Sequence, residues 1–105
     1  MKIEKVNSFI VSLKKTPNGT IIVITDSELI GKKFEDGKKQ LDLTQRFYVG
    51  EEKSAEEIKK MVGGAYVLHL TGVRAVLLGE ELDLVDSNKV LVIKNIPHAE
   101  VVMEG

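Results

Sequence analysis

The sequence predicts a small α+β domain in which a mixed or antiparallel sheet, beginning with an N-terminal hairpin, carries about two helices. Three observations support this. β-branched runs and alternating apolar residues predict strands, two apolar stripes at helical spacing predict helices, and the two kinds of element are mixed along the chain. The length of 105 residues leaves no room for a second domain, so residues 1–105 are expected to form one.

The first two strands are expected to form the opening hairpin. Apolar residues alternate imperfectly over Val6–Leu13, with Phe9, Val11 and Leu13 on one face, which is typical of a strand with one buried face. The turn signal Pro17–Gly19 follows, because proline fixes φ at the second turn position and Asn-Gly tolerates positive φ. Ile21–Ile24 is an unbroken β-branched run, which favours a central strand covered on both faces.

The next segment is expected to consist of turns and one short strand. Asp26–Gly31 indicates a turn or a single helical turn, with an Asp or Ser side chain that can cap its backbone N–H groups. Lys32–Gly37 is charged and expected to be exposed. Lys39–Thr44 is predicted as a short strand with Leu41 and Leu43 on one side.

The first helix begins at a capping-box signal. Ser54 and Glu57 have the required spacing, at which each side chain accepts a hydrogen bond from the other residue's backbone N–H. The apolar stripe of this helix consists of Ala55, Ile58, Met61 and Val62. The pair Gly63–Gly64 ends the helix, and Ala65–Leu70 is then predicted as a strand, with continuation of the helix as the alternative.

A second helix and two strands complete the domain. Thr71 is expected to cap a helix over Gly72–Leu82. The residues expected on its buried face are Val73, Val76, Leu77 and Leu78. Val90–Ile93 is predicted as another buried strand, and after a bend at Pro97 the last strand spans residues 99–103.

The composition excludes several classes of protein. The chain has no cysteine, which excludes disulfide scaffolds, cysteine-ligated metals and thiol nucleophiles. The longest apolar-rich run, Ala65–Leu78, is too short to cross a bilayer, and Met1–Lys5 lacks the apolar stretch of a signal peptide. A cytoplasmic protein with no membrane partner is therefore expected. Abundant lysine and glutamate without cysteine or tryptophan is common in proteins from hot environments.

Positive charge is concentrated in the first half of the chain. Residues 1–46 hold 9 basic and 6 acidic side chains, whereas residues 47–105 hold 6 basic and 10 acidic ones. The basic half contains the lysine pairs Lys14–Lys15, Lys32–Lys33 and Lys38–Lys39. If they converge, they can contact phosphates or an acidic protein surface. The alternative, that they keep loops solvated and protect strand edges, is favoured by the whole-chain charge of -1.

Groups suited to catalysis are few. His69 and His98 are the only histidines, and they could share a metal with Glu100 only if the fold brings them together. A hydrogen-bonded core position is the expectation for His69. The acidic cluster Glu80–Asp86 is expected to be a solvated face, and no phosphate-binding loop or nucleophile elbow is present. We therefore expect no catalytic residue, cofactor or metal, and a binding role is favoured over an enzyme.

Two local features indicate binding instead. Arg46–Tyr48 places a cation beside two rings, and if Phe47 is buried, an alternating backbone turns Tyr48 outward. Pro97–His98 lies between two predicted strands, where a rigid loop can carry a functional histidine. The alternative for each is a packed corner.

Four short motifs in this order resemble the archaeal domain-of-unknown-function family 424. They are Asp26-x-Glu28-Leu29-x-Gly31, Phe47-Tyr48-x-Gly50, Gly72-x-Arg74-Ala75-Val76 and Pro97-His98-Ala99. The resemblance runs from about Ile21 to Val102. It implies an archaeal, cytoplasmic, compact α+β protein. It does not imply an enzymatic activity, because the family has no known function. The chain departs from the family pattern at His69 and Glu100, where asparagine and glutamine are common, so a ligand held there in relatives would be held differently.

The leading hypothesis is a non-enzymatic binding module with RNA or a ribosome-associated component of translation as its partner. Its surface is expected to comprise Arg46, Tyr48, Arg74 and His98, with supporting charge from Lys32, Lys33, Lys38 and Lys39. One alternative is an enzyme or small-ligand protein with a pocket around His98, Glu100, Arg74 and Tyr48. The other is a protein-interaction or oligomeric subunit that pairs through an exposed edge strand.

Overall fold

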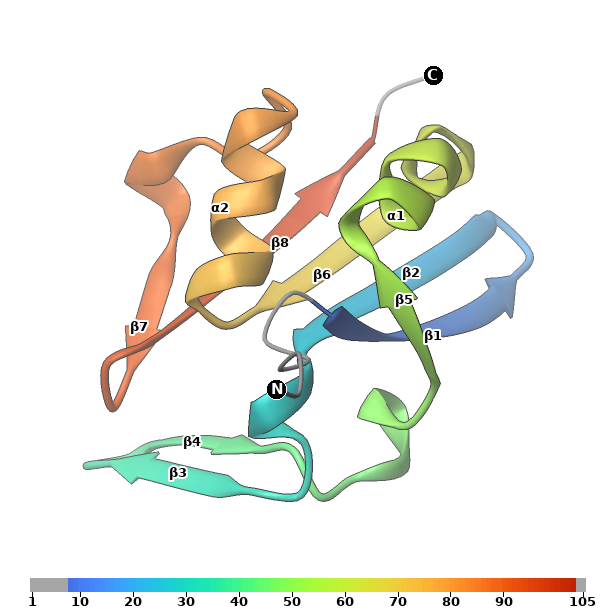
Figure 1. Ribbon diagram of the computed structural model, residues 1–105. Coiled ribbons are helices and arrows are strands. Elements are labelled where there is room, and N and C mark those ends of the chain that lie inside the picture. Colours follow the sequence, from blue (N-terminus) through green and yellow to red (C-terminus); the bar gives the residue numbers. More distant parts are fainter. Residues whose placement is uncertain (1–7, 104–105) are drawn as a thin grey trace, which may run out of the picture.

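A six-stranded mixed sheet with the strand order β5-β1-β2-β6-β8-β7 forms the centre of the molecule, and a separate two-stranded hairpin, β3-β4, lies beside it (Figure 1). The computed structural model describes residues 8–103. The strands are β1 Ser8–Thr16, β2 Gly19–Asp26, β3 Lys33–Asp36, β4 Lys39–Asp42, β5 Glu51–Ser54, β6 Ala65–Thr71, β7 Leu91–Ile93 and β8 Ile96–Val102. The helices are α1 Ala55–Met61 and α2 Val73–Glu81, and the short 3₁₀ turns are Ser27–Leu29, Arg46–Tyr48, Val62–Gly64 and Ser87–Lys89.

The predicted α+β class, opening hairpin and two helices are confirmed. β1 and β2 pair antiparallel up to Thr16 and Gly19, and Gly19 has a φ of 140°, which the glycine of the turn signal tolerates. β2 pairs in parallel with β6, and β6 pairs antiparallel with β8, so the sheet is mixed. Val6 and Asn7, with which the predicted first strand begins, lie outside the described residues.

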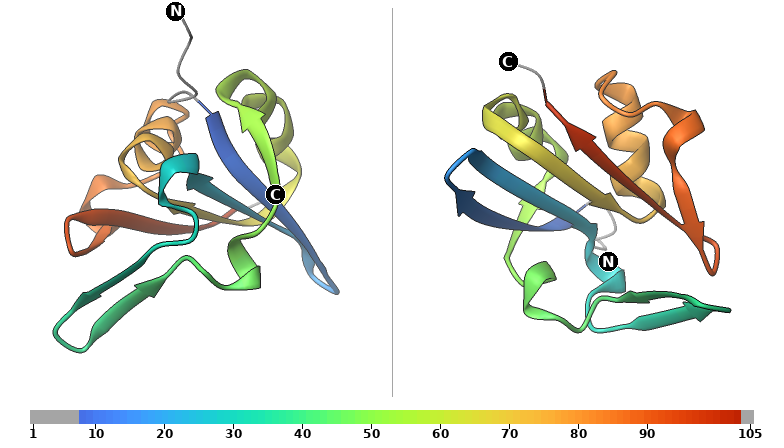
Figure 2. Two further views of the ribbon diagram at one scale, coloured as in Figure 1. Left: turned by 60° about the horizontal axis from the view of Figure 1, so that its bottom comes forward. Right: turned by 180° about the vertical axis from the view of Figure 1, so that it is seen from behind.

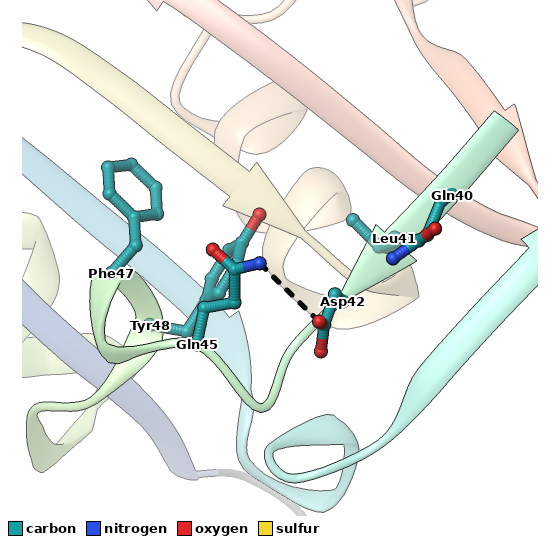
Figure 3. A pocket seen from close by; sticks show the side chains of 6 residues that line it. All are labelled: Gln40, Leu41, Asp42, Gln45, Phe47 and Tyr48. Atoms are coloured by element: carbon teal, nitrogen blue, oxygen red, sulfur yellow. Dashed lines mark hydrogen bonds between the residues drawn. The ribbon is translucent and has the colours of Figure 1, made fainter.

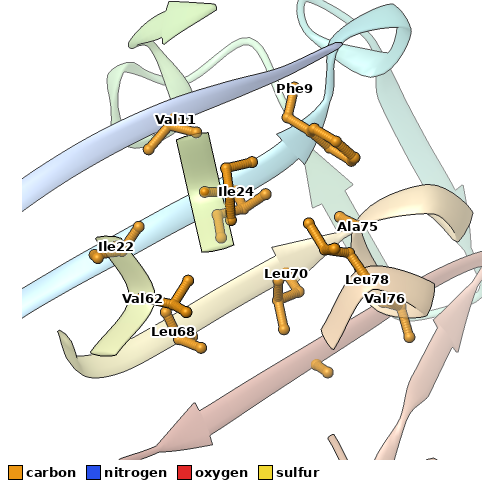
Figure 4. Close-up of a cluster of buried hydrophobic side chains, with 12 residues drawn as sticks. Phe9, Val11, Ile22, Ile24, Val62, Leu68, Leu70, Ala75, Val76 and Leu78 are labelled. Atoms are coloured by element: carbon orange, nitrogen blue, oxygen red, sulfur yellow. The ribbon is translucent and has the colours of Figure 1, made fainter. Parts of the chain in front are cut away.

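Both helices cover the same face of the sheet (Figure 2, left). Alternate residues of the central strands point toward them, including Ile22 and Ile24 of β2 and Leu68 and Leu70 of β6. Figure 4 shows this core. Its buried members are Phe9, Val11, Ile22, Ile24, Ile58, Val62, Leu68, Leu70, Ala75, Val76, Leu78 and Ala99. Burial of this apolar surface is the main term that stabilises the fold.

The other face of the sheet, which we call the helix-free face, is partly covered by residues 41–48. Val23 of β2 points to this side and is 0% exposed. The 3₁₀ turn Arg46–Tyr48 contacts β1 and β2 from below, and Leu41 and Leu43 are buried just before it. β2 is therefore covered on both faces, as its unbroken β-branched run predicted.

Two strands were missed because their sequences are polar. Lys33–Asp36 forms β3, which pairs with β4, and Glu51–Ser54 forms the edge strand β5, which pairs with β1. Both keep most of their side chains exposed. Charged residues are common on such edges because they oppose further strand pairing.

The end of the chain differs from the prediction in two ways. β7 is an edge strand rather than a buried one, with Leu91 and Val92 more than half exposed. The turn before β8 is formed by Lys94 and Asn95, both with positive φ, as in a tight two-residue hairpin. Consequently Pro97 and the residue after it lie inside β8 instead of in a rigid loop.

Each helix has a side-chain cap, but only the first cap is the predicted one. At α1 the capping box is present, with the Ser54 N–H donating to Glu57 Oε1 at 2.9 Å and the Glu57 N–H donating to Ser54 Oγ at 3.2 Å. At α2 the cap is not Thr71, which is the last residue of β6. The Asp26 carboxylate, at the end of β2, accepts the backbone N–H groups of residues 74 and 75 at 3.0 and 2.8 Å.

The apolar face of α2 is narrower than predicted. Val76 and Leu78 are buried together with Ala75, whereas Val73 and Leu77 are about half exposed. The helix begins one residue after Gly72, whose N–H donates to the Pro97 carbonyl of β8 at 2.9 Å and so ties the helix start to the sheet.

Candidate functional site

Four polar side chains of β6 and β8 lie together on the helix-free face. The register pairs His69 with Glu100 and Thr71 with His98, so alternate residues of the two strands face the same side. His69 Nε2 lies 3.7 Å from Glu100 Oε2. The Thr71 hydroxyl and His98 Nδ1 are 2.8 Å apart and share a hydrogen bond. The two imidazole centroids are 6.0 Å apart.

Aromatic rings from the 3₁₀ turn Arg46–Tyr48 complete this group. Phe47 packs edge-on against His69, with 5.2 Å between centroids, and edge-on against Tyr48 at 5.0 Å. Lys14 Nζ of β1 lies 5.5 Å from the Phe47 centroid, in the position of a cation–π contact. We call Phe47, Tyr48, His69 and His98 the ring cluster. All four are only partly buried, so their rings are available to a ligand.

Burial controls the protonation of two members of the ring cluster. Desolvation, reinforced by the neighbouring His69, lowers the pKa of His98 below its usual 6.5, and Glu100 partly opposes this. Burial, followed by the charge of Asp42, raises the pKa of the Tyr48 phenol above 10.0. Near neutral pH the cluster therefore presents a neutral imidazole and a neutral phenol, which suit stacking and hydrogen bonding.

The two neighbours of His98 are expected to move its pKa in opposite directions. Replacing His69 with glutamine removes an electrostatic effect that lowers the pKa of His98 and should raise this pKa toward 6.5, whereas Glu100→Gln removes an attractive anion and should lower it further. An NMR titration of the His98 ring protons checks both. Equal pKa values of His98 in the two variants would contradict the placement of His69 and Glu100 beside it.

The lowered pKa of His98 also sets the sign of a pH effect on stability. Between its folded pKa and 6.5 the unfolded chain binds more protons than the folded chain, so the contribution of His98 to stability is lost as the pH falls through this window.

A groove beside the ring cluster has a volume of about 260 Å³ (Figure 3). It is lined by Gln40, Leu41, Asp42, Gln45, Phe47 and Tyr48. Leu41 supplies its buried apolar part, and the Asp42 carboxylate supplies an anion. Asp42 Oδ1 accepts hydrogen bonds from the N–H and hydroxyl of Thr44 at 3.0 and 2.5 Å, and these bonds lower the pKa of Asp42. Tyr48 was among the predicted site residues, whereas Gln40, Asp42 and Gln45 were not.

The structure brings together only part of the predicted binding surface. Tyr48 and His98 belong to the ring cluster, and Arg46 is exposed on the same 3₁₀ turn as Tyr48. Arg74 lies on the opposite side of the sheet, where its guanidinium is 5.0 Å from the ring of the core residue Phe9 and pairs with Glu28. The structure therefore does not form the predicted pocket around Arg74, His98 and Tyr48, because the sheet separates Arg74 from the other two residues.

The predicted lysines share one hairpin but not one face. Lys32 precedes β3, Lys38 lies in the turn, and all four side chains are exposed. In the strand register, Lys33 is opposite Asp42 and Lys39 is opposite Asp36. Lys39 therefore shares a face with Asp36, three residues after Lys33, so Lys33 and Lys39 lie on opposite faces of the two-stranded ribbon. The hairpin can therefore offer positive charge on both sides, with carboxylates between the lysines.

Residues 8–103 contain no group of three or more histidine, aspartate or glutamate side chains placed to hold a metal ion. Over the same residues, no helix is long and apolar enough to cross a membrane.

Comparison with known proteins identifies a family and a similar fold. A crystal structure of an uncharacterized conserved protein from Methanopyrus kandleri is similar, with a TM-score of 0.75 and 15% identity over 93% of this chain and 96% of that one. At this identity the likeness concerns the fold alone. None of the curated proteins matches the chain. The family model described as a protein of unknown function (DUF424) matches residues 13–103, and the chain therefore belongs to the DUF424 family.

Proposed function

We propose that this protein is a non-enzymatic module that binds single-stranded RNA in the cytoplasm of an archaeal cell, near the translation machinery. The observation that carries this proposal is the ring cluster beside the cations Lys14 and Arg46, on the face of the sheet that no helix covers. Sheets that bind single-stranded RNA stack unpaired bases on partly exposed rings and hold phosphates with nearby cations.

The chemistry of the surface favours binding over catalysis. A nucleophile for catalysis would need a hydroxyl that is hydrogen-bonded to a histidine and exposed to a substrate. Within residues 8–103, the hydroxyl bonded to a histidine is that of Thr71, which is 0% exposed and so cannot reach a substrate. The imidazoles, the phenol and the phenyl ring are flat surfaces that any base can stack on. The exposed lysines of the β3-β4 hairpin lie beyond the groove, where they can reach the phosphates of a strand that crosses the ring cluster.

An NMR titration locates the RNA site directly. Adding a ten-nucleotide single-stranded RNA of mixed sequence is expected to shift the amide signals of β6, β8 and the turn Arg46–Tyr48. The signals of α1 and α2 should stay in place, because the helices cover the opposite face. Shifts confined to the helices would contradict the proposal, and so would the absence of any shift at millimolar RNA.

Replacing Lys32, Lys33, Lys38 and Lys39 with glutamate is expected to weaken RNA binding and flatten its dependence on salt. Each phosphate contact of a single strand contributes about 0.7 to the slope of log affinity against log salt. The slope in fluorescence anisotropy titrations should therefore fall by about 0.7 for every lysine that contacts a phosphate. An unchanged slope would remove the hairpin from the binding surface.

A matched pair of variants controls for net charge. Lys38→Gln/Lys39→Gln and Lys59→Gln/Lys60→Gln remove the same charge, but Lys59 and Lys60 lie on α1, across the sheet. Only the hairpin variant is expected to change the slope by more than the nonspecific loss of two charges. Equal changes in the two variants would show that overall charge, not this surface, governs binding.

A further inference from the structure

We infer that the groove lined by Gln40, Leu41, Asp42, Gln45, Phe47 and Tyr48 binds one unpaired base and selects guanine through the Asp42 carboxylate. This inference rests on the proposed RNA binding and names the base that the site reads.

The size of the groove suits a single flat ring system. Its volume of about 260 Å³ lies just below the range of about 300–1,000 Å³ that is typical of pockets for drug-sized ligands. One base fits such a space, whereas a complete dinucleotide does not. Because Phe47 and Tyr48 line the groove and also belong to the ring cluster, a strand stacked on the cluster can place its next base here.

Apolar and aromatic surface lines the groove between its polar groups. In Figure 3 the side chains of Tyr48 and Gln45 lie between Phe47 and Asp42, and Leu41 lies on the far side of Asp42. Tyr48 is partly buried and Leu41 is 5% exposed, so both are held in place by the fold. A base that enters the groove can therefore stack on a ring while its edge faces the carboxylate.

Asp42 keeps acceptor capacity for a ligand. Its Oδ1 is engaged by the N–H and hydroxyl of Thr44, but the contact of its Oδ2 is a long one, 3.4 Å from the Gln45 side-chain amide. The bonds from Thr44 also fix the orientation of the carboxylate. An ionised carboxylate accepts hydrogen bonds and cannot donate them, so it favours a ligand edge made of donors.

Guanine is the base whose edge matches a carboxylate. Its N1–H and N2 amino group are adjacent donors on the Watson–Crick edge, and the two lone pairs of Asp42 Oδ2, the oxygen that Thr44 does not engage, can accept from both at once. Adenine, cytosine and uracil place an acceptor beside their donor, so one of these lone pairs would face another lone pair. The side-chain amides of Gln40 and Gln45 line the same groove and can donate to the remaining acceptors of guanine.

The test measures selectivity rather than affinity alone. Nine-nucleotide uridine RNAs with a single central guanosine, inosine or adenosine are titrated by fluorescence anisotropy against the whole chain. Inosine lacks only the N2 amino group, so it removes one of the two donors. A good bidentate contact gives about tenfold discrimination or more, and the guanosine RNA is expected to bind about tenfold more tightly than either of the others.

Two variants connect the selectivity to the groove. Asp42→Asn keeps the acceptor for the Thr44 N–H but presents a donor to the ligand, and the preference for guanosine should disappear. Asp36→Asn makes the same charge change on the neighbouring strand β3, outside the groove lining, and should keep the preference. Circular dichroism melts verify that both variants are folded.

The outcomes separate the inference from the proposed function. RNA binding with no preference for guanosine overturns the guanine site and leaves the RNA-binding proposal standing. A preference that survives Asp42→Asn also overturns the site, since another group must then read the base. Failure of the wild-type chain to bind any of the three RNAs overturns both. A preference lost only in Asp42→Asn supports the inference.

Discussion

Replacing Asp26 with alanine is expected to lower the free energy of unfolding by about 3 kcal/mol, because one buried and one partly buried N–H group at the start of α2 lose their acceptor. Asp26 is 3% exposed, and its carboxylate accepts from the N–H groups of Arg74 and Ala75. Water cannot replace it at this buried position. For a domain of this size the melting temperature should fall by about 12 °C or more.

The matched control is Glu28→Ala. Glu28, two residues after Asp26, forms an ion pair with Arg74. The side chain of Glu28 is 53% exposed. Removing an exposed ion pair costs about 0–1 kcal/mol, so this variant should unfold at nearly the same urea concentration as the wild-type chain. If Asp26→Ala were no less stable than Glu28→Ala, the Asp26 carboxylate would not be a cap that stabilises the start of α2.

The pH dependence of this effect has a defined sign. Burial raises the pKa of Asp26 above 3.8, although the two backbone hydrogen bonds and the charge of Arg74 oppose the rise. In the window between 3.8 and the raised value the folded chain binds more protons than the unfolded chain, so the stability contributed by Asp26 is lost as the pH rises. The stability advantage of the wild-type chain over Asp26→Asn should therefore shrink as the pH rises through this window.

The helix cap also shows what the sequence could not predict. Hydrophobic periodicity is local, so it predicted the hairpin, both helices and β6 correctly. Thr71 has the residue type and position of a cap, and nothing local indicates that Asp26, nearly fifty residues earlier, takes that role. The same contact explains why two of the motifs on which the family resemblance was based lie together, because Asp26 and Glu28 of one motif meet Arg74 and the start of α2 in the other. These contacts hold the start of α2 against the end of β2.

The candidate site was predictable only where a residue is unusual for its surroundings. Tyr48 follows another ring, and His98 follows a proline, and these local features singled them out. Asp42 and Gln45 are ordinary polar residues beside a turn, and their grouping with Phe47 depends on how residues 41–48 pack under the sheet. One signal in the sequence could have indicated Asp42. An aspartate two positions before Thr44 is typical of a side chain that accepts a backbone N–H and fixes a turn.

Replacing Gly50 with alanine is expected to destabilise the chain by about 3 kcal/mol and to displace the ring cluster. A Cβ on Gly50 would lie 2.5 Å from the carbonyl carbon of Val11, closer still to its oxygen, and 2.9 Å from the Cα of Ser12. These are backbone atoms of β1, so no rotation of a side chain can make room. The start of β5 must separate from β1, and urea denaturation should show the loss.

Gly63→Ala provides the comparison, because no atom lies within 4 Å of a Cβ at that position in the turn Val62–Gly64. It should be neutral or stabilise the chain by up to about 1 kcal/mol, since alanine has fewer conformations to lose on folding. Equal stability of the two variants would contradict the close approach of Gly50 to β1.

Gly50 also links stability to binding. It lies two residues after Tyr48, between the turn that carries the rings and the strand that anchors this turn to β1. When β5 shifts, Phe47 must leave its position 5.2 Å from the ring of His69, and the NMR signals of the His69 ring should change accordingly. Gly63→Ala should leave these signals in place. The Phe47-Tyr48-x-Gly50 motif therefore combines two rings with the one residue type that allows the backbone to hold them against the sheet.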